Sequence, residues 1–337
     1  MAFVITRHTK EQNMYSESQL LEKVNYYIQN ISYPTQPDGL YEPIRYTLAL
    51  GGKRIRPVLM LMAYNLYKDD VETIMSNAIG LETYHNFTLL HDDLMDRADM
   101  RRGNATVHKK WNDNTAILSG DAMLILAYKF MCAPTTEHIA KALDTFTEAT
   151  LGVCEGQQYD TDFESRNDVK EEEYMEMIRL KTSLLLACAM KIGAQLAGAS
   201  DEDAQNLYDF GEKMGLAFQL QDDLLDVYGD PAIFGKKIGG DITCNKKTYM
   251  LINALNISNE QQRETLLSWI AKKNFDIEEK IKAVTQIYNE VDIKSICTKR
   301  IEQLFEESLS KLDKVNISTE KKEQLKLFAH NLMGRNH

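Results

Sequence analysis

The sequence predicts an all-α protein, and three observations support this. Only six prolines occur in 337 residues, and Pro34, Pro37 and Pro43 lie close together near the N-terminus. Apolar runs with helical spacing follow one another through the chain. Alternating strand patterns are largely absent between them. Because no linker-like segment divides these runs, we expect one helical domain over 1–337, with 1–19 as a flexible N-terminal extension.

The first four predicted helices are separated by helix-breaking residues. Pro34 interrupts the chain after the first helix, Gly51-Gly52 ends the second, and Pro57 suits the first turn of the third. The fourth helix is long and carries aspartates near its C-terminal end. These helices are expected at 20–31, 38–52, 58–67 and 71–96, and the polar residues 97–108 predict a loop.

The second half follows the same plan. Pro134 ends a strongly apolar helix, and Gly152 and Gly156 interrupt the composition of the next one. A buried apolar helix and a long helix with a second group of aspartates come after these. The expected ranges are 115–131, 138–160, 168–199 (buried over 184–196) and 201–228, then a Gly- and Lys-rich loop over 229–247 and short helices in 248–337.

The totals restrict the class of protein. The chain is 44% apolar and 26% charged, as is ordinary for a soluble globular protein. A net charge of −11 argues against general nucleic-acid binding. The five cysteines are scattered and form no CxxC pair, which argues against disulfides and structural zinc. The polar N-terminus and the lack of a run of about 18 apolar residues predict a cytoplasmic protein without a membrane span.

Two acidic clusters of the form Asp-Asp-x-x-Asp stand out, at 92–96 and 222–226. Residues four apart share a helix face, so Asp92 points with Asp96, and Asp222 with Asp226. Like charges at that spacing destabilise a bare helix. Mg²⁺ accepts such carboxylates and fills its other positions with water and substrate phosphate. The sequence therefore predicts two magnesium sites that grip a diphosphate.

Basic clusters accompany the acidic ones. Arg101-Arg102 follows the first cluster, and Lys236-Lys237 follows the second, with Lys246 just beyond. Upstream, the segment 51–57 places three cations on a Gly-led turn that enters a helix, where anions bind readily. Arginine's planar fork suits phosphate oxygens. Two acidic clusters and at least three basic clusters are typical of a site for two diphosphates.

This ordered set resembles the trans-prenyltransferases, the isoprenyl diphosphate synthases, over nearly the whole of 51–247. The resemblance implies an isoprenoid-synthase-type helical bundle around a central cavity, usually a homodimer, with three Mg²⁺ ions per active site. It implies the Mg²⁺-dependent head-to-tail condensation of isopentenyl diphosphate with an allylic diphosphate. The departing pyrophosphate leaves an allylic cation, which the double bond of isopentenyl diphosphate attacks.

The resemblance also assigns residues by role. The implied metal ligands are Asp92, Asp96, Asp222, Asp223 and Asp226. Residues implied at the allylic substrate are Arg101, Lys181, Thr182, Gln219, Lys236 and Lys246, where Lys237 is an alternative to Lys236. Those implied at isopentenyl diphosphate are Lys53, Arg56, His85 and Arg102. Gln157 and Asp160 match a segment of the cavity wall, and Arg335 is a candidate C-terminal contact.

Product length is expected to depend on the residues that precede the first cluster. Tyr84, Thr88 and Asp92 share a helix face, and Phe87 lies beside it. In the resembling family an aromatic residue five positions before the cluster stops chain growth early, which favours products of about fifteen to twenty carbons. The alternatives are a longer-chain polyprenyl diphosphate synthase and a class I terpene cyclase, and beyond these a silent synthase subunit or a helical scaffold.

Overall fold

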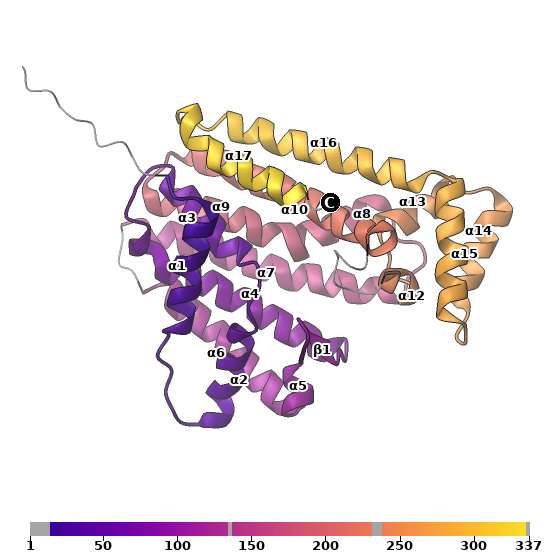
Figure 1. Ribbon diagram of the computed structural model, residues 1–337, viewed down its shortest axis with the longest axis horizontal. Helices are drawn as coiled ribbons and strands as arrows, with labels where there is room; N and C mark the ends of the chain where they lie inside the picture. The colour runs from indigo at the N-terminus through magenta and orange to yellow at the C-terminus, as the bar shows by residue number, and fades with distance from the viewer. Residues whose placement is uncertain (1–13, 134–136, 231–237, 335–337) are drawn as a thin grey trace, which may run out of the picture. The chain divides into compact units, whose positions relative to one another are not determined.

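The computed structural model describes residues 14–133, 137–230 and 238–334, and these are almost entirely helical (Figure 1). They form two compact units. The first comprises Met1–Ile139, Gly193–Ala199 and Ile317–Gln324, and the second comprises Ala140–Ile192, Ser200–Asn316 and Leu325–His337. Helices α9 (Leu184–Ala197) and α17 (Thr319–Met333) contribute residues to both. The prediction of an all-α protein is confirmed.

The first unit is built around α4 (Met75–Met95), which packs along α6 (Asp113–Met131). The other helices of this unit are α1 (Glu17–Gln29), α2 (Asp38–Ala49), α3 (Ile55–Asn65) and α5 (Val107–Lys110). The helix expected over 71–96 starts as a separate 3-10 turn, η1 (Val71–Ile74). Of the expected extension 1–19, residues 17–19 belong to α1 and residues 1–13 lie outside the described part of the chain.

The loop expected over 97–108 contains a small hairpin. Strand β1 (Met100–Arg101) pairs antiparallel with β2 (Asn104–Ala105). The two residues between them, Arg102 and Gly103, both have positive φ, at 51° and 76°. That is the backbone of a tight hairpin turn, which Gly adopts at little cost. The turn therefore fixes where the two adjacent arginines, Arg101 and Arg102, leave the backbone.

The second unit is built around α10 (Asp201–Tyr228), which packs along α16 (Ile293–Asp313) (Figure 1). The other helices of this unit are α7 (Ile139–Glu164), α8 (Glu171–Ile178), α12 (Gly240–Thr243), α13 (Tyr249–Ile257), α14 (Glu260–Ala271) and α15 (Ile277–Glu290). The apolar core includes residues of α8, α10, α13, α15 and α16, among them Tyr174, Leu220 and Leu304.

Two features of the second unit differ from expectation. The C-terminal part is not made of short helices only, because α16 spans 21 residues and buries an apolar face that includes Cys297, Leu304 and Leu312. Between α8 and α9 the helix widens into a π-helical segment, η2 (Arg179–Ser183). Such segments are rare and frequently mark functional sites.

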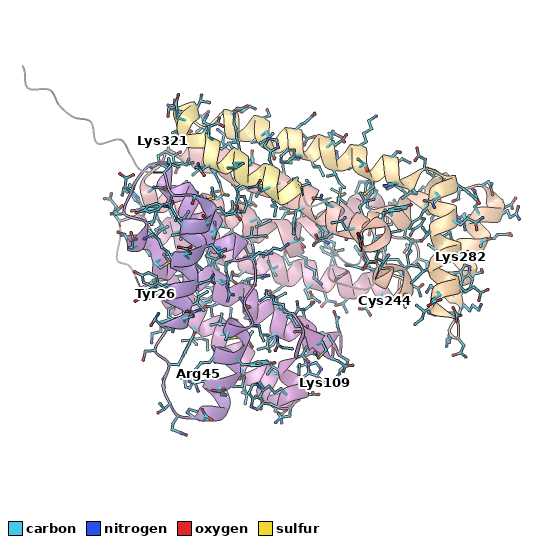
Figure 2. The ribbon with its side chains drawn as sticks, in the orientation of Figure 1. Tyr26, Arg45, Lys109, Cys244, Lys282 and Lys321 are labelled. Carbon is cyan, nitrogen blue, oxygen red and sulfur yellow. The ribbon has the colours of Figure 1, made fainter. Side chains whose placement is uncertain are left out.

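The continuous helix Glu171–Ala197, which comprises α8, η2 and α9, is long and apolar enough to cross a membrane. However, 78% of its most apolar window is buried inside the protein, as in the core helix of a soluble protein. Charged side chains such as Lys109 and Lys282 instead lie exposed on the surfaces of their units (Figure 2).

Candidate functional site

The first acidic cluster lies at the C-terminal end of α4, as predicted, but its three aspartates have different surroundings. Asp96 is exposed and Asp92 is half-buried, whereas Asp93 is buried. The Nε atom of Arg101 donates to Asp93 Oδ2 at 2.7 Å, and an Nη atom of Arg101 lies 3.9 Å from Asp92 Oδ2. Burial raises the pKa of Asp93, and the hydrogen bond from Arg101 opposes this. Asp93 thus holds Arg101 in place.

The three cations of the Gly-led turn before α3 also differ in burial. Arg54 is buried, with a side chain 3% exposed, and its Nη1 donates to Glu82 Oε1 on α4 at 2.7 Å. It also donates to the carbonyl of Leu48 at 2.6 Å. Lys53 is exposed and Arg56 is half-buried. Arg54, which the sequence does not distinguish from its neighbours, therefore holds the turn, and Lys53 and Arg56 remain the candidates for an anion.

A group of arginines surrounds His85 on α4. Arg56 Nη1 lies 3.0 Å from His85 Nε2. Burial lowers the pKa of His85 well below its usual value, and the nearby arginines, Arg56 first, lower it further. His85 is therefore neutral, with Nε2 placed to accept from Arg56. Burial lowers the pKa of Arg56 to about 10, and the charge of Arg102 adds to this effect.

Arg102 comes close to the Gly-led turn from the hairpin. Its Nη1 donates to the carbonyl of Gly51. The φ of Gly52 is +126°, which favours glycine, and a Cβ there would lie 2.8 Å from the guanidinium carbon of Arg102 and would displace that side chain. Within the first unit, several arginines thus converge and Glu82 is a buried anion beside them. Because Glu82 is paired with Arg54, the half-buried Arg56 and the exposed Arg102 leave an excess of positive charge around His85, which favours binding of an anion such as a diphosphate.

The residues expected to limit chain length lie one to two turns before the first cluster. Tyr84 is buried, and its ring centroid is 5.4 Å from that of Phe87. Phe87 in turn lies 4.8 Å from the ring of His91. Thr88 donates its hydroxyl to the carbonyl of His85 at 2.8 Å. The aromatic rings are thus in contact one after another along α4 toward the acidic cluster, in tilted and edge-to-face arrangements.

The second acidic cluster lies at the C-terminal end of α10. Asp222 and Asp226 are half-buried and Asp223 is buried. Asp223 accepts hydrogen bonds on both oxygens, from Tyr174 on Oδ2 and from Gln219 Nε2 on Oδ1 at 3.0 Å. Burial is the main cause that raises its pKa to about 7. Asp223 thus differs from Asp222 and Asp226 in being buried and hydrogen-bonded on both oxygens, and its implied role as a metal ligand stays a prediction.

Lys181 and Thr182 lie on the π-helical segment η2 and contact the neighbouring helices α7 and α10. Lys181 Nζ lies 2.6 Å from Asp160 Oδ2 on α7, and Thr182 Oγ1 donates to Gln219 Oε1 on α10 at 2.9 Å. Two glycines, which lack a Cβ, leave room for the backbone of this segment. A Cβ on Gly156 would lie 2.5 Å from the backbone nitrogen of Lys181, and a Cβ on Gly215 would lie 2.8 Å from the Cα atom of Ser183.

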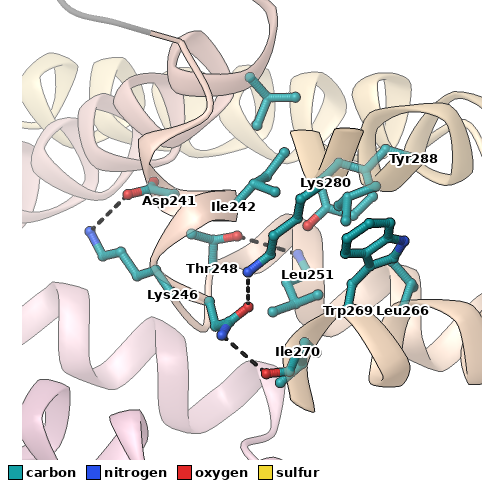
Figure 3. A pocket seen from close by; sticks show the side chains of 13 residues that line it. Asp241, Ile242, Lys246, Thr248, Leu251, Leu266, Trp269, Ile270, Lys280 and Tyr288 are labelled. Atoms are coloured by element: carbon teal, nitrogen blue, oxygen red, sulfur yellow. Dashed lines mark hydrogen bonds and ion pairs between the residues drawn. The ribbon is translucent and has the colours of Figure 1, made fainter. Parts of the chain in front are cut away.

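The part of the loop after the second cluster that the structure describes is hydrogen-bonded to that cluster and to α15. The backbone N–H of Asp241 donates to Asp226 Oδ2 at 2.9 Å. Lys246 Nζ lies 3.8 Å from Asp241 Oδ1 (Figure 3). The buried Lys280 of α15 donates to Asn245 Oδ1 at 2.6 Å. These contacts hold Lys246 beside the acidic cluster. Lys236, Lys237 and Arg335 lie outside the described residues.

The donor set fits magnesium at both clusters. Asp92 with Asp96, and Asp222 with Asp226, are pairs of carboxylates one helical turn apart and not fully buried. Hard carboxylate oxygens that leave room for water and phosphate are what Mg²⁺ requires. Sequence reasoning found these pairs, but it missed Arg54, Glu82, Asp93 and Tyr174. Helical spacing predicts that the second aspartate of each cluster points inward. It does not predict which residue that aspartate contacts.

Comparison with known proteins points to one family. The polyprenyl synthetase family model matches residues 37–290. A geranylgeranyl diphosphate synthase of Methanosarcina mazei is 42% identical over 222 residues, which cover 65% of this chain and 68% of that protein. A short chain isoprenyl diphosphate synthase of Methanocaldococcus jannaschii is 38% identical over 267 residues, which cover 79% and 81%. A crystal structure of a geranylgeranyl pyrophosphate synthase has a TM-score of 0.92 and 42% identity, covering 96% of this chain and 100% of that one. This chain belongs to the polyprenyl synthetase family.

Proposed function

We propose that this protein is a short-chain prenyl diphosphate synthase that joins isopentenyl diphosphate to an allylic diphosphate. The observation that carries the proposal is the presence of two kinds of diphosphate site. One kind consists of paired carboxylates at the ends of α4 and α10, which suit a diphosphate held through Mg²⁺. The other consists of arginines gathered around a neutral His85, which suit a diphosphate held directly. A reaction with two diphosphate substrates needs both.

Asp92, Asp96, Asp222 and Asp226 would hold the ions, of which the family resemblance implies three per active site. Bound Mg²⁺ supplies positive charge that stabilises the departing pyrophosphate. Arg101 lies beside this cluster because Asp93 holds it, and Lys246 lies beside Asp226 because the loop is braced by Lys280. These cations reach phosphate oxygens without a metal.

Lys53, Arg56, His85 and Arg102 would hold isopentenyl diphosphate. Arg56 is oriented by the ring of His85 and Arg102 by the carbonyl of Gly51, so their guanidinium groups are ordered before a ligand arrives. Ordering in advance lowers the entropy cost of binding. Arg54 and Glu82 would not touch substrate, because both are buried and paired with one another.

The condensation breaks the allylic C–O bond and forms a C–C bond between the two substrates. The pyrophosphate leaves with the electron pair of the C–O bond, and the double bond of isopentenyl diphosphate supplies the pair for the new bond. A proton is then lost from isopentenyl diphosphate, and the released pyrophosphate accepts it. Lys181, Thr182 and Gln219 would present their dipoles or hydrogen bonds toward the allylic group, held by Asp160 and by one another.

We infer a product of about fifteen to twenty carbons, with Tyr84, Phe87 and Thr88 as the residues that limit it. Tyr84 and Phe87 are in ring contact one to two turns before Asp92, and their bulk there would block a chain that grows along α4. The relatives in Methanosarcina mazei and Methanocaldococcus jannaschii are a geranylgeranyl and a short chain isoprenyl diphosphate synthase, which supports the same range.

The protein is proposed to act as a cytoplasmic homodimer with one catalytic domain per chain. The helix α6 supports the dimer, since Ile117, Leu118 and Ile125 are large apolar side chains that are 44%, 60% and 70% exposed. Exposed apolar side chains on one helix are typical of a protein–protein interface. Sedimentation of the purified protein tests this, and the variant Ile125→Glu should shift a dimer toward the monomer.

The reaction is tested by incubating purified protein with Mg²⁺, isopentenyl diphosphate and, separately, dimethylallyl, geranyl and farnesyl diphosphates, with products identified by mass spectrometry. A discrete product of about fifteen to twenty carbons that disappears with a chelator supports the proposal. The variant Asp92→Asn with Asp96→Asn should abolish it, while the surface control Lys282→Gln should not. Products above about thirty carbons would instead indicate a longer-chain synthase, and a hydrocarbon formed without isopentenyl diphosphate would indicate a cyclase.

A further inference from the structure

The hydroxyl of Tyr174 is an unusual polar group for its surroundings. Tyr174 lies on α8 and its side chain is fully buried among apolar residues such as Leu220 and Leu224. A buried hydroxyl needs a partner, because an unpaired one costs free energy. Its partner is Asp223 Oδ2, on the second acidic cluster. The chain therefore places a polar contact inside an apolar core, next to residues of the candidate site.

Two further hydrogen bonds link Asp223 to Gln219 and Gln219 to Thr182, the residues proposed to act at the allylic substrate. Asp223 Oδ1 accepts from Gln219 Nε2 at 3.0 Å, one helical turn earlier on α10. The other end of the Gln219 amide, Oε1, accepts from Thr182 Oγ1 at 2.9 Å. Asp223 is the acceptor in this contact, so the amide of Gln219 turns its nitrogen toward Asp223. The oxygen of Gln219 is then fixed toward Thr182.

We propose that Tyr174 is a positioning residue for the condensation: it holds Asp223, and through Asp223 it fixes the side chains of Gln219 and Thr182. This inference rests on the proposed function, in which Gln219 and Thr182 act at the allylic substrate. Tyr174 itself touches no substrate. Without its hydroxyl, the Asp223 carboxylate loses one of two donors and turns to find another, and the Gln219 amide follows it.

The π-helical segment fixes the position of Thr182 but not that of Gln219, so Gln219 needs a further contact to hold its side chain. Thr182 belongs to η2, whose backbone passes close to Gly156 on one side and Gly215 on the other. The backbone of Thr182 is thus tightly placed, whereas the side chain of Gln219 can rotate about several bonds. A fixed acceptor at Asp223 is what limits that rotation. Small displacements of a group at the reacting centre reduce the rate strongly.

The test compares Tyr174→Phe with Tyr249→Phe in the full-length enzyme. Tyr249 is a matched control because it is buried in the same core, and its hydroxyl makes no hydrogen bond to Asp223, Gln219 or Thr182 in the described residues. We expect Tyr174→Phe to lower kcat roughly 10-fold or more, because the reacting groups are displaced. The KM for isopentenyl diphosphate should change less than about twofold, and the melting temperature should stay close to that of the control.

A double-mutant cycle separates positioning from a general loss of structure. In a Gln219→Ala background, Tyr174→Phe should change kcat less than about twofold, since the group through which it acts is already gone. Independent effects on kcat would multiply and would overturn the inference. An equal loss of kcat in Tyr249→Phe would overturn it as well.

A crystal structure of Tyr174→Phe decides the inference independently of activity. If Gln219 keeps its hydrogen bonds to both Asp223 and Thr182, Tyr174 does not position it and the inference is wrong. If Gln219 leaves Thr182, the inference holds even where the wild-type protein forms no prenyl diphosphate. That last result would refute the proposed function alone.

Discussion

Removing one partner of the Arg54–Glu82 ion pair should cost several times more stability than removing one partner of an exposed ion pair of the same length. Arg54 Nη1 and Glu82 Oε1 are 2.7 Å apart with both side chains 3% exposed. Arg97 Nη1 and Asp113 Oδ2 are also 2.7 Å apart, but these side chains are 65% and 49% exposed. Both pairs belong to the first unit. They therefore differ mainly in burial.

The variant Glu82→Gln removes the charge but keeps the shape and the acceptor oxygen. It leaves the Arg54 guanidinium buried without a counter-charge, which costs about 3–5 kcal/mol in other proteins. Asn86 Nδ2 donates to Glu82 Oε1 at 2.9 Å, and the amide oxygen of Gln can still accept this bond. We therefore expect a loss of about 3 kcal/mol. Asp113→Asn should cost less than about 1 kcal/mol, because water replaces the exposed partner.

The measurement is the free energy of unfolding from urea titrations of the wild type, Glu82→Gln and Asp113→Asn. Equal losses for the two variants would refute the reasoning from burial. A third variant, Arg54→Met with Glu82→Leu, should lose less than Glu82→Gln, since an apolar pair leaves no buried charge. A larger loss in this double variant would show that the ion pair itself, and not the avoidance of an unpaired charge, stabilises the turn.

Three further predictions concern the site. Phe87→Ala should lengthen the product, because the ring beside Tyr84 is removed; mass spectrometry of the products checks this, and an unchanged product would exclude Phe87 as the limit. Because the pKa of His85 is held well below 6.5, its imidazole becomes protonated in the unfolded chain but stays neutral in the folded chain as the pH falls through about 6.5. Wild-type stability should therefore fall there by up to about 1.4 kcal/mol per pH unit more steeply than that of His85→Asn, and urea titrations that give parallel curves would contradict this. Gly156→Ala should cost about 1–3 kcal/mol and most of the activity, because its Cβ meets the backbone of η2; Gly152→Ala, whose Cβ meets the movable end of a Leu side chain, should cost less in the same assays.

Helical periodicity was enough to predict where the acidic clusters lie. Both are at the C-terminal ends of long helices, α4 and α10, within a few residues of the predicted positions. Spacing by four residues also predicted which aspartates share a face. These are local properties of a helix, so they can be derived without knowing what packs against it.

The partners of the inward residues could not be derived in this way. Arg54 lies between Lys53 and Arg56, and nothing in that run marks it as the buried one. Its burial depends on a left-handed backbone, with φ at 48°, and on Glu82, which α4 brings near from 28 residues away. The π-helical segment η2 likewise has no distinctive composition. Of the two glycines that make room for it, Gly156 was visible as an interruption in the sequence and Gly215 was not.

In both acidic clusters one aspartate is buried and the other two are not, but the two buried aspartates have different partners. In each, one aspartate turns inward and holds a residue that is proposed to face substrate: Asp93 holds Arg101, and Asp223 holds Gln219. The first inward carboxylate is hydrogen-bonded to a cation, whereas the second is hydrogen-bonded to neutral donors. Burial raises the pKa of Asp223 to about 7, and the charge of Lys246 opposes this rise. A neutral Gln219 suits the proposed contact with a developing carbocation, and the charge of the neighbouring Lys181 is balanced by Asp160. Under the proposed function, the inward aspartate of the first cluster thus holds a cation for phosphate, and that of the second holds a neutral amide for the allylic group.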